Sequence, residues 1–182
     1  MQAKRIVLIG AYCAVLIGGQ LALSGIAGVE VVTVMLAAFA FAFGRADGVI
    51  LSIAFSLLRC VLFGFFPNVI ILYFVYYPAL AFCFGWFGKK CDKKVTVKSH
   101  AVAVALALVF GALFTALDNV ITPLYYGYSK KLTQIYHAAS IPVLISQTVC
   151  AVFTVLFLFP PLVKTLNRFT TRRKGKEVNE QP

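Results

Sequence analysis

Residues 101–121 read AVAVALALVFGALFTALDNVI, a run of 21 residues whose one charged side chain is Asp118. About 20 apolar residues in an α-helix, each adding about 1.5 Å, cross the roughly 30 Å of hydrocarbon in a bilayer. The run therefore predicts a membrane-spanning helix. The rest of the chain has the same character, because 61% of its 182 residues are apolar, 13% are charged and its mean hydropathy is +0.90.

This composition excludes several classes of protein. A soluble domain is about 45–50% apolar and about 25% charged, and one of this size still exposes about a third of the surface of its unfolded chain. The apolar excess therefore fits neither a water-soluble core nor a disordered chain. The five cysteines are scattered without a C-x-x-C pair, which argues against a disulfide framework or a metal site. We expect one all-α integral membrane domain over residues 1–182, without a cofactor.

Turn signals divide the chain into six apolar runs. Gly and Pro residues end several of the runs, and a loop with five lysines, 89–100, separates the fourth run from the fifth. We predict six transmembrane helices, at 5–23, 29–44, 49–66, 69–88, 101–121 and 140–163. Residues 124–139 are expected to form an outer loop or an interfacial helix, and residues 164–182 a basic cytoplasmic tail.

The first run has two interpretations. It follows Lys4 and Arg5 and ends near the small residues Ala22 and Ser24, a pattern that is also typical of a cleaved signal peptide. Because the later runs are membrane-embedded as well, we favour a retained first helix.

The basic residues set a direction across the membrane. The formal net charge is +11, from 17 Lys and Arg against six Asp and Glu. With the N-terminus inside and six alternating helices, 14 basic residues fall on the inner side, Lys130 and Lys131 fall outside, and Arg59 lies within a helix. This is the positive-inside pattern, and it predicts an N-in/C-in topology. The basic residues are not interleaved with aromatic side chains, so binding to nucleic acid is not expected.

Polar residues within the apolar runs gather in the half of the membrane that this topology places outside. An ionisable group in hydrocarbon is costly unless it is paired or hydrated. Arg59 has two interpretations: it pairs with Glu30 or Asp118 between helices, or it faces an anionic or carbonyl group of a solute in an outward-open pocket. The clustering favours a pocket, and its candidate residues are Arg59, Glu30, Asp118, Asn119, Gln147 and Asn68.

Tyrosines near the outer end extend this candidate site. Tyr73, Tyr76 and Tyr77 share one helical face by their three- and four-residue spacing, so Tyr73 and Tyr77 are placed to stack on a planar solute. Packing in the core or in an interfacial aromatic belt is the alternative, and we favour it because such packing needs no ligand.

The first helix carries a stripe of small residues, Gly10, Ala14 and Gly18, at four-residue spacing. Such stripes let two helices approach closely. The contact is either internal to the bundle, which we favour for a stripe considered alone, or with a partner membrane protein.

Catalytic motifs are absent from the sequence. It has no H-E-x-x-H motif, no P-loop and no paired intramembrane carboxylates, and the predicted topology places His100 and His137 on opposite sides of the membrane. We therefore expect a protein that is not an enzyme and does not hydrolyse ATP, so active transport would need an energising partner.

Several features combine into one pattern: six short-looped helices in 182 residues, the N-in/C-in charge distribution and the small-residue stripe. Together they resemble the substrate-binding S component of an energy-coupling factor (ECF) vitamin transporter. The last helix departs from this pattern, because Leu144, Gln147 and Ala151 stand where related sequences often carry Asp, His and Asn. Short segments that are similar to that family are 28–33 (GVEVVT), 43–45 (FGR), 62–65 (LFGF), 141–142 (IP) and 159–162 (FPPL).

The resemblance implies an S-component-like bundle that binds a vitamin-like solute near the outer face of a bacterial plasma membrane. The stripe on the first helix would dock on the ECF coupling transmembrane subunit, and two ATPase subunits would drive uptake. The alternative is a non-catalytic membrane scaffold subunit, similar to the MreD-like rod-shape-determining proteins, that organises a cell-envelope complex.

Overall fold

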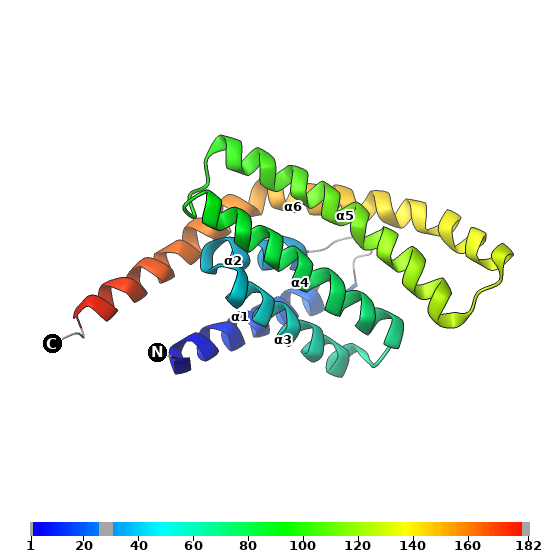
Figure 1. The fold of residues 1–182 in the computed structure, drawn as a ribbon, viewed down its shortest axis with the longest axis horizontal. Helices are drawn as coiled ribbons and strands as arrows, with labels where there is room; N and C mark the ends of the chain where they lie inside the picture. Colours follow the sequence, from blue (N-terminus) through cyan, green and yellow to red (C-terminus); the bar gives the residue numbers. More distant parts are fainter. Residues whose placement is uncertain (1, 26–30, 180–182) are drawn as a thin grey trace.

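The structure, a computed structural model, describes residues 2–25 and 31–179. Over these residues the chain forms six α-helices and no strand, and Figure 1 shows them packed in a bundle. The expected all-α class is confirmed. The helices are α1 (Gln2–Leu23), α2 (Val32–Phe43), α3 (Arg45–Phe63), α4 (Pro67–Lys90), α5 (Val97–Tyr126) and α6 (Lys130–Asn179).

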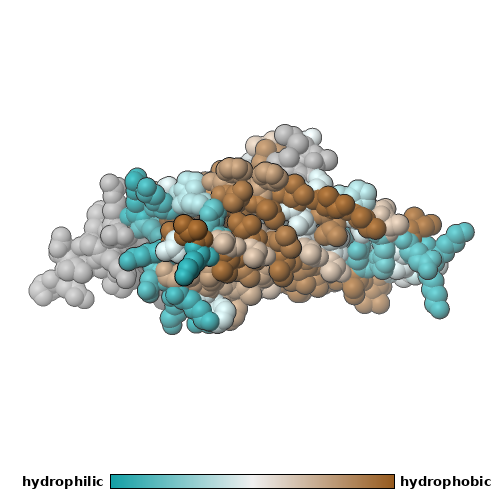
Figure 2. Space-filling view, turned by 90° about the horizontal axis from the view of Figure 1, so that it is seen from above, coloured by the Kyte–Doolittle hydropathy of each residue, from teal (hydrophilic) through white to brown (hydrophobic). Residues whose placement is uncertain are grey.

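Five of the described helices, α1 and α3 to α6, are long and apolar enough to cross a membrane, judged by length and composition. Figure 2 shows the surface that results, with a hydrophobic belt over the middle and hydrophilic side chains toward both ends. Apolar side chains that face outward in such a belt suit a hydrocarbon solvent rather than water. The chain therefore has the make-up of a multi-pass membrane protein.

The second helix is shorter than the predicted 29–44 and lies at the centre of the bundle. The 12 residues of α2 rise about 18 Å, less than the thickness of the hydrocarbon. Ten of these residues are buried, and the helix packs against α1, α3, α4 and α6. A helix that is apolar on all sides is stable where neighbours cover every side.

The turn between the last two helices is much shorter than the predicted outer segment 124–139. Helix α5 continues past Pro123 to Tyr126, and α6 begins at Lys130. Gly127 makes the turn with a φ of 62°, a left-handed conformation that glycine adopts without strain. Its N–H donates to the backbone oxygen of Pro123. Proline inside α5 removes one backbone donor, and packing against neighbouring helices compensates for this loss.

Helix α6 extends through most of the segment predicted as a tail, because it runs for 50 residues to Asn179. It contains three prolines, Pro142, Pro160 and Pro161. Figure 1 shows that α6 changes direction in its orange part, where the last two prolines stand. Proline lacks the N–H that the preceding turn needs, so it kinks a helix without ending it here. Beyond the bend the helix leads away from the bundle.

Contacts between helices gather basic residues at one end of the bundle, called here the basic end. Arg5 of α1 forms an ion pair with Asp47 near the start of α3. Asn167 of α6 donates a hydrogen bond of 2.7 Å to the backbone oxygen of Lys93, which follows α4. The α3–α4 and α5–α6 turns lie at the opposite end.

Two glycines of α4 let the end of α2 approach closely. A Cβ added at Gly88 would lie 2.3 Å from the backbone oxygen of Phe41, and one at Gly85 would lie 2.6 Å from the backbone nitrogen of Arg45. The ring of Phe41 then packs edge-on against Phe159 of α6, with 5.3 Å between ring centroids. The α2–α3 corner is thus in backbone contact with α4.

This close approach predicts a stability loss on adding one methyl group. Gly88→Ala should lower the free energy of unfolding by about 1–3 kcal/mol, because the backbones must separate to admit the new Cβ. Thermal unfolding of the purified protein in detergent measures the effect. Gly10→Ala is the matched control, since a Cβ there meets no atom within 4 Å, and equal melting temperatures for the two variants would contradict the packing described.

Candidate functional site

A chain of hydrogen bonds joins α4, α5 and α6 toward the opposite end of the bundle. Asn68 Nδ2 donates to Thr122 Oγ1 at 3.1 Å, and the Thr122 hydroxyl donates to Asp118 Oδ1 at 2.7 Å. The phenol of Tyr136 donates to Asp118 Oδ2 at 2.6 Å, and that of Tyr126 donates to Asn68 Oδ1 at 3.3 Å. The Asp118 carboxylate is therefore the acceptor at which α5 and α6 meet.

Beside this carboxylate lies a cavity of about 230 Å³ between α5 and α6. Two residues predicted for the site, Asp118 and Gln147, line it together. The cavity is small and of mixed polarity, with donor and acceptor groups from both helices. Its other lining residues are Phe114, Thr115, Tyr136, Ala139, Ser140 and Val143.

Two buried oxygen atoms at this site have no hydrogen-bond partner among the described residues: Thr115 Oγ1 and Asn119 Oδ1. Thr115 lines the cavity and is 5% exposed. Asn119 Nδ2 donates at 2.9 Å to Ser140 Oγ, which holds the Asn119 side chain beside the cavity wall. Most buried polar groups have a partner, so these two oxygens are unsatisfied acceptors in the protein beside the cavity.

Arg59 lies apart from this cavity, on α3. Its Cζ is 4.4 Å from the ring centroid of Tyr73 and 5.1 Å from that of Phe63, which are cation–π distances. Within the described residues its Nε has no hydrogen-bond partner, and no carboxylate forms an ion pair with it. The alternative pairing with Asp118 is not formed among the described residues, and that carboxylate accepts hydrogen bonds from Thr122 and Tyr136. Glu30 lies outside the described residues.

The tyrosines of α4 pack into the core. Tyr73, Tyr76 and Tyr77 are all buried, as a shared helical face requires. The rings of Tyr73 and Tyr77 meet edge to face with centroids 4.9 Å apart, and Tyr76 contacts Phe114 in the same way. Phe114 also lines the cavity, whereas the three tyrosines and Arg59 do not.

Sequence reasoning missed Thr115, Tyr136 and Ser140 as lining residues of this cavity. Tyr136, Ser140 and Gln147 recur at spacings of four and seven, which places them on one helical face. The predicted helix began at residue 140, so Tyr136 fell in the segment predicted as an outer loop or an interfacial helix, and the continuous face was not recognised. With the helix beginning at Lys130, Tyr136, Ser140 and Gln147 lie on one face of the same helix.

The small-residue stripe of α1 faces away from the bundle. Gly10, Ala14 and Gly18 are all exposed, and a Cβ at Gly10 or Gly18 would meet no atom within 4 Å. The internal contact favoured from the sequence is therefore not formed within the part of the chain that the structure describes. The stripe is open to lipid or to another protein.

The hydrogen bond from Tyr136 to Asp118 predicts a measurable stabilisation. Tyr136→Phe should lower the free energy of unfolding by about 1–2 kcal/mol, because a hydrogen bond to a carboxylate is lost. The matched control is Tyr125→Phe, since Tyr125 is exposed at the α5–α6 turn. Thermal unfolding in detergent compares the two variants, and an unchanged melting temperature for Tyr136→Phe would show that the bond does not hold α5 to α6.

No protein-family model, curated protein or solved structure matches this chain. The geometry of the cavity, the exposed stripe and the charge distribution therefore provide the basis for a functional proposal.

Proposed function

We propose that the chain is the solute-binding S subunit of an ECF-type ABC importer. The observation that carries the proposal is the cavity between α5 and α6, which Asp118, Gln147 and Thr115 line toward the end of the bundle opposite the basic end. The exposed stripe on α1 supports it, because this face is available to a coupling subunit. A vitamin or related micronutrient would be captured and then imported by two ATPase subunits of a separate module.

The orientation follows from the basic end. Positively charged residues favour the cytoplasmic side of a membrane, so the basic end faces the cytoplasm and the cavity lies toward the outside. Arg5 of α1 and Asp47 of α3 are in contact, so these two helices begin at the same end. With α2 taken as the second pass, the proposal is six alternating passes in a bacterial plasma membrane, with both termini inside.

The cavity also limits the chemistry of the solute. Its volume of about 230 Å³ is below the roughly 300–1,000 Å³ of drug-sized sites, so the solute is small. Asp118 accepts two hydrogen bonds and retains lone pairs for more. This carboxylate suits a solute that presents N–H or O–H donors.

A scaffold subunit of the MreD-like kind is the second candidate. The observation that favours it is that the polar network joins helices: Asn68 binds Thr122, and Asp118 binds Tyr136. Such bonds stabilise a helical bundle whether or not a solute binds. A scaffold would carry no specific small molecule through purification.

Native mass spectrometry of the purified chain tests the solute site. We expect a small molecule to co-purify with the wild-type protein. The dissociation constant of this small molecule should rise at least tenfold in Asp118→Asn and in Gln147→Ala. The first variant replaces a charged acceptor by a neutral amide, and the second removes an amide from the cavity wall. Arg59→Ala should retain binding and lower the melting temperature, since the guanidinium stacks on Tyr73 outside the cavity. Wild-type protein without any bound small molecule would instead support the scaffold.

The stripe predicts a docking surface for the coupling subunit. Ala14→Trp should abolish co-purification with a co-expressed ECF coupling subunit while solute occupancy stays unchanged, because the indole prevents close helix approach. Ala112→Trp is the matched control, since Ala112 is also exposed but lies on α5. Undisturbed assembly of the Ala14→Trp variant would rule out docking through this face.

A further inference from the structure

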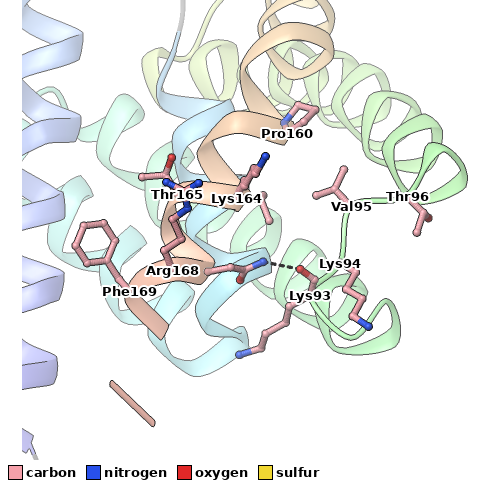
Figure 3. Close-up of a pocket in the computed structure, with 11 residues that line it drawn as sticks. Lys93, Lys94, Val95, Thr96, Pro160, Lys164, Thr165, Arg168 and Phe169 are labelled. Atoms are coloured by element: carbon pink, nitrogen blue, oxygen red, sulfur yellow. Dashed lines mark hydrogen bonds between the residues drawn. The ribbon is translucent and has the colours of Figure 1, made fainter. Parts of the chain in front are cut away.

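A second, larger hollow lies at the basic end of the bundle. It has a volume of about 1020 Å³ and lies between the C-terminal part of α6 and the loop that joins α4 to α5. Figure 3 shows the two walls, with Lys93 to Thr96 on the loop and Pro160 to Phe169 on α6. The hollow is remote from the Asp118 cavity and uses none of its residues.

The hollow follows from the proline bend and from one hydrogen bond. Pro160 lines it at the point where α6 changes direction, so the helix beyond diverges from the bundle. Asn167 then donates to the backbone oxygen of Lys93 at 2.7 Å, which ties the diverging helix back to the loop (Figure 3). The two walls are thereby joined at one edge and separated at the other.

The lining combines positive charge with apolar surface. Lys93 and Lys94 from the loop and Lys164 and Arg168 from α6 supply four cations. Lys164 and Arg168 stand four residues apart, so they share one face of the helix. No carboxylate lines the hollow among the residues described. The apolar lining residues are Val95, Pro160, Val163 and Phe169.

The arrangement of these groups identifies the class of ligand. Figure 3 shows the basic side chains distributed around the hollow rather than directed at one point. A free phosphate ion would be held best by donors that converge on it. A molecule with an anionic head and a hydrocarbon tail uses both the spread cations and the apolar walls. Basic pockets between helices at the cytoplasmic side of a membrane bind anionic lipid headgroups.

We propose that this hollow binds an anionic phospholipid, whose headgroup contacts the cations of both walls, Lys94, Lys164 and Arg168, and whose acyl chain lies along Val95 and Pro160. The position fits, because the apolar run of α6 gives way to charged residues at Lys164, which is the boundary between hydrocarbon and headgroups. The site is independent of the solute cavity, so it holds whether the chain is an S subunit or a scaffold.

Native mass spectrometry of the full chain in detergent tests the site with three probes: palmitoyl-oleoyl phosphatidylglycerol, phosphatidylcholine with the same acyl chains, and glycerol 3-phosphate. The wild-type protein should retain phosphatidylglycerol at least tenfold more tightly than phosphatidylcholine. Glycerol 3-phosphate at the same concentration should not displace it. The variant K94Q/K164Q/R168Q should bind phosphatidylglycerol at least tenfold more weakly, and K94R/K164R should bind it normally.

The matched control removes three cations from the same end outside the hollow, as K89Q/K90Q/K98Q. All three side chains are exposed and do not line the hollow, so phosphatidylglycerol binding should change less than twofold. Equal losses in the two triple variants would overturn the proposal, because they would reveal general charge attraction. Displacement by glycerol 3-phosphate would overturn it in favour of a free-anion site. Equal binding of the two lipids would also overturn the proposal, because the basic residues would then not distinguish an anionic headgroup from a zwitterionic one.

Discussion

The packing of the short helix α2 inside the other helices is the contact on which the rest of the structure depends. Its Phe39 and Phe41 are fully buried, and the α2–α3 corner touches the backbone of α4 at Gly85 and Gly88. A helix of this length is too short to span the hydrocarbon. Its neighbours must cover it on every side, so they present their remaining apolar surface outward, and the belt in Figure 2 is the result.

The sequence predicts the fold class and the number of helices well, but their ends poorly. Long uncharged runs determine helices in hydrocarbon because every backbone N–H and C=O must be bonded within the chain. The same requirement keeps α5 helical through Pro123, beyond the predicted end at residue 121. Proline ends a helix more readily where the carbonyl group that loses its N–H partner can bind water instead. Inside a helical bundle that carbonyl group does not reach water.

The candidate site was only partly predictable for a different reason. A helical spacing places Asp118 or Gln147 on a face of its own helix, but it does not say which helix that face meets. The structure brings these two together at one cavity and stacks Arg59 on Tyr73 outside it. Tyr136 was missed as a site residue because the predicted start of the last helix, residue 140, lies ten residues after the start of α6 at Lys130. Register between helices depends on packing of many side chains at once, which a local pattern does not contain.

The unpaired oxygens at the cavity bear on the choice between a binding subunit and a scaffold. A buried polar atom without a partner costs about 1–3 kcal/mol, whereas an interhelical hydrogen bond in a membrane contributes on average about 0.6 kcal/mol. At these magnitudes the few interhelical hydrogen bonds of the network at Asp118 do not offset the cost of leaving Thr115 Oγ1 and Asn119 Oδ1 unsatisfied. A purely structural contact between α5 and α6 would be more stable with alanine at position 115 and no cavity. The two unsatisfied oxygens are a cost that a purely structural contact between α5 and α6 has no reason to carry, which supports the proposed binding subunit over the proposed scaffold.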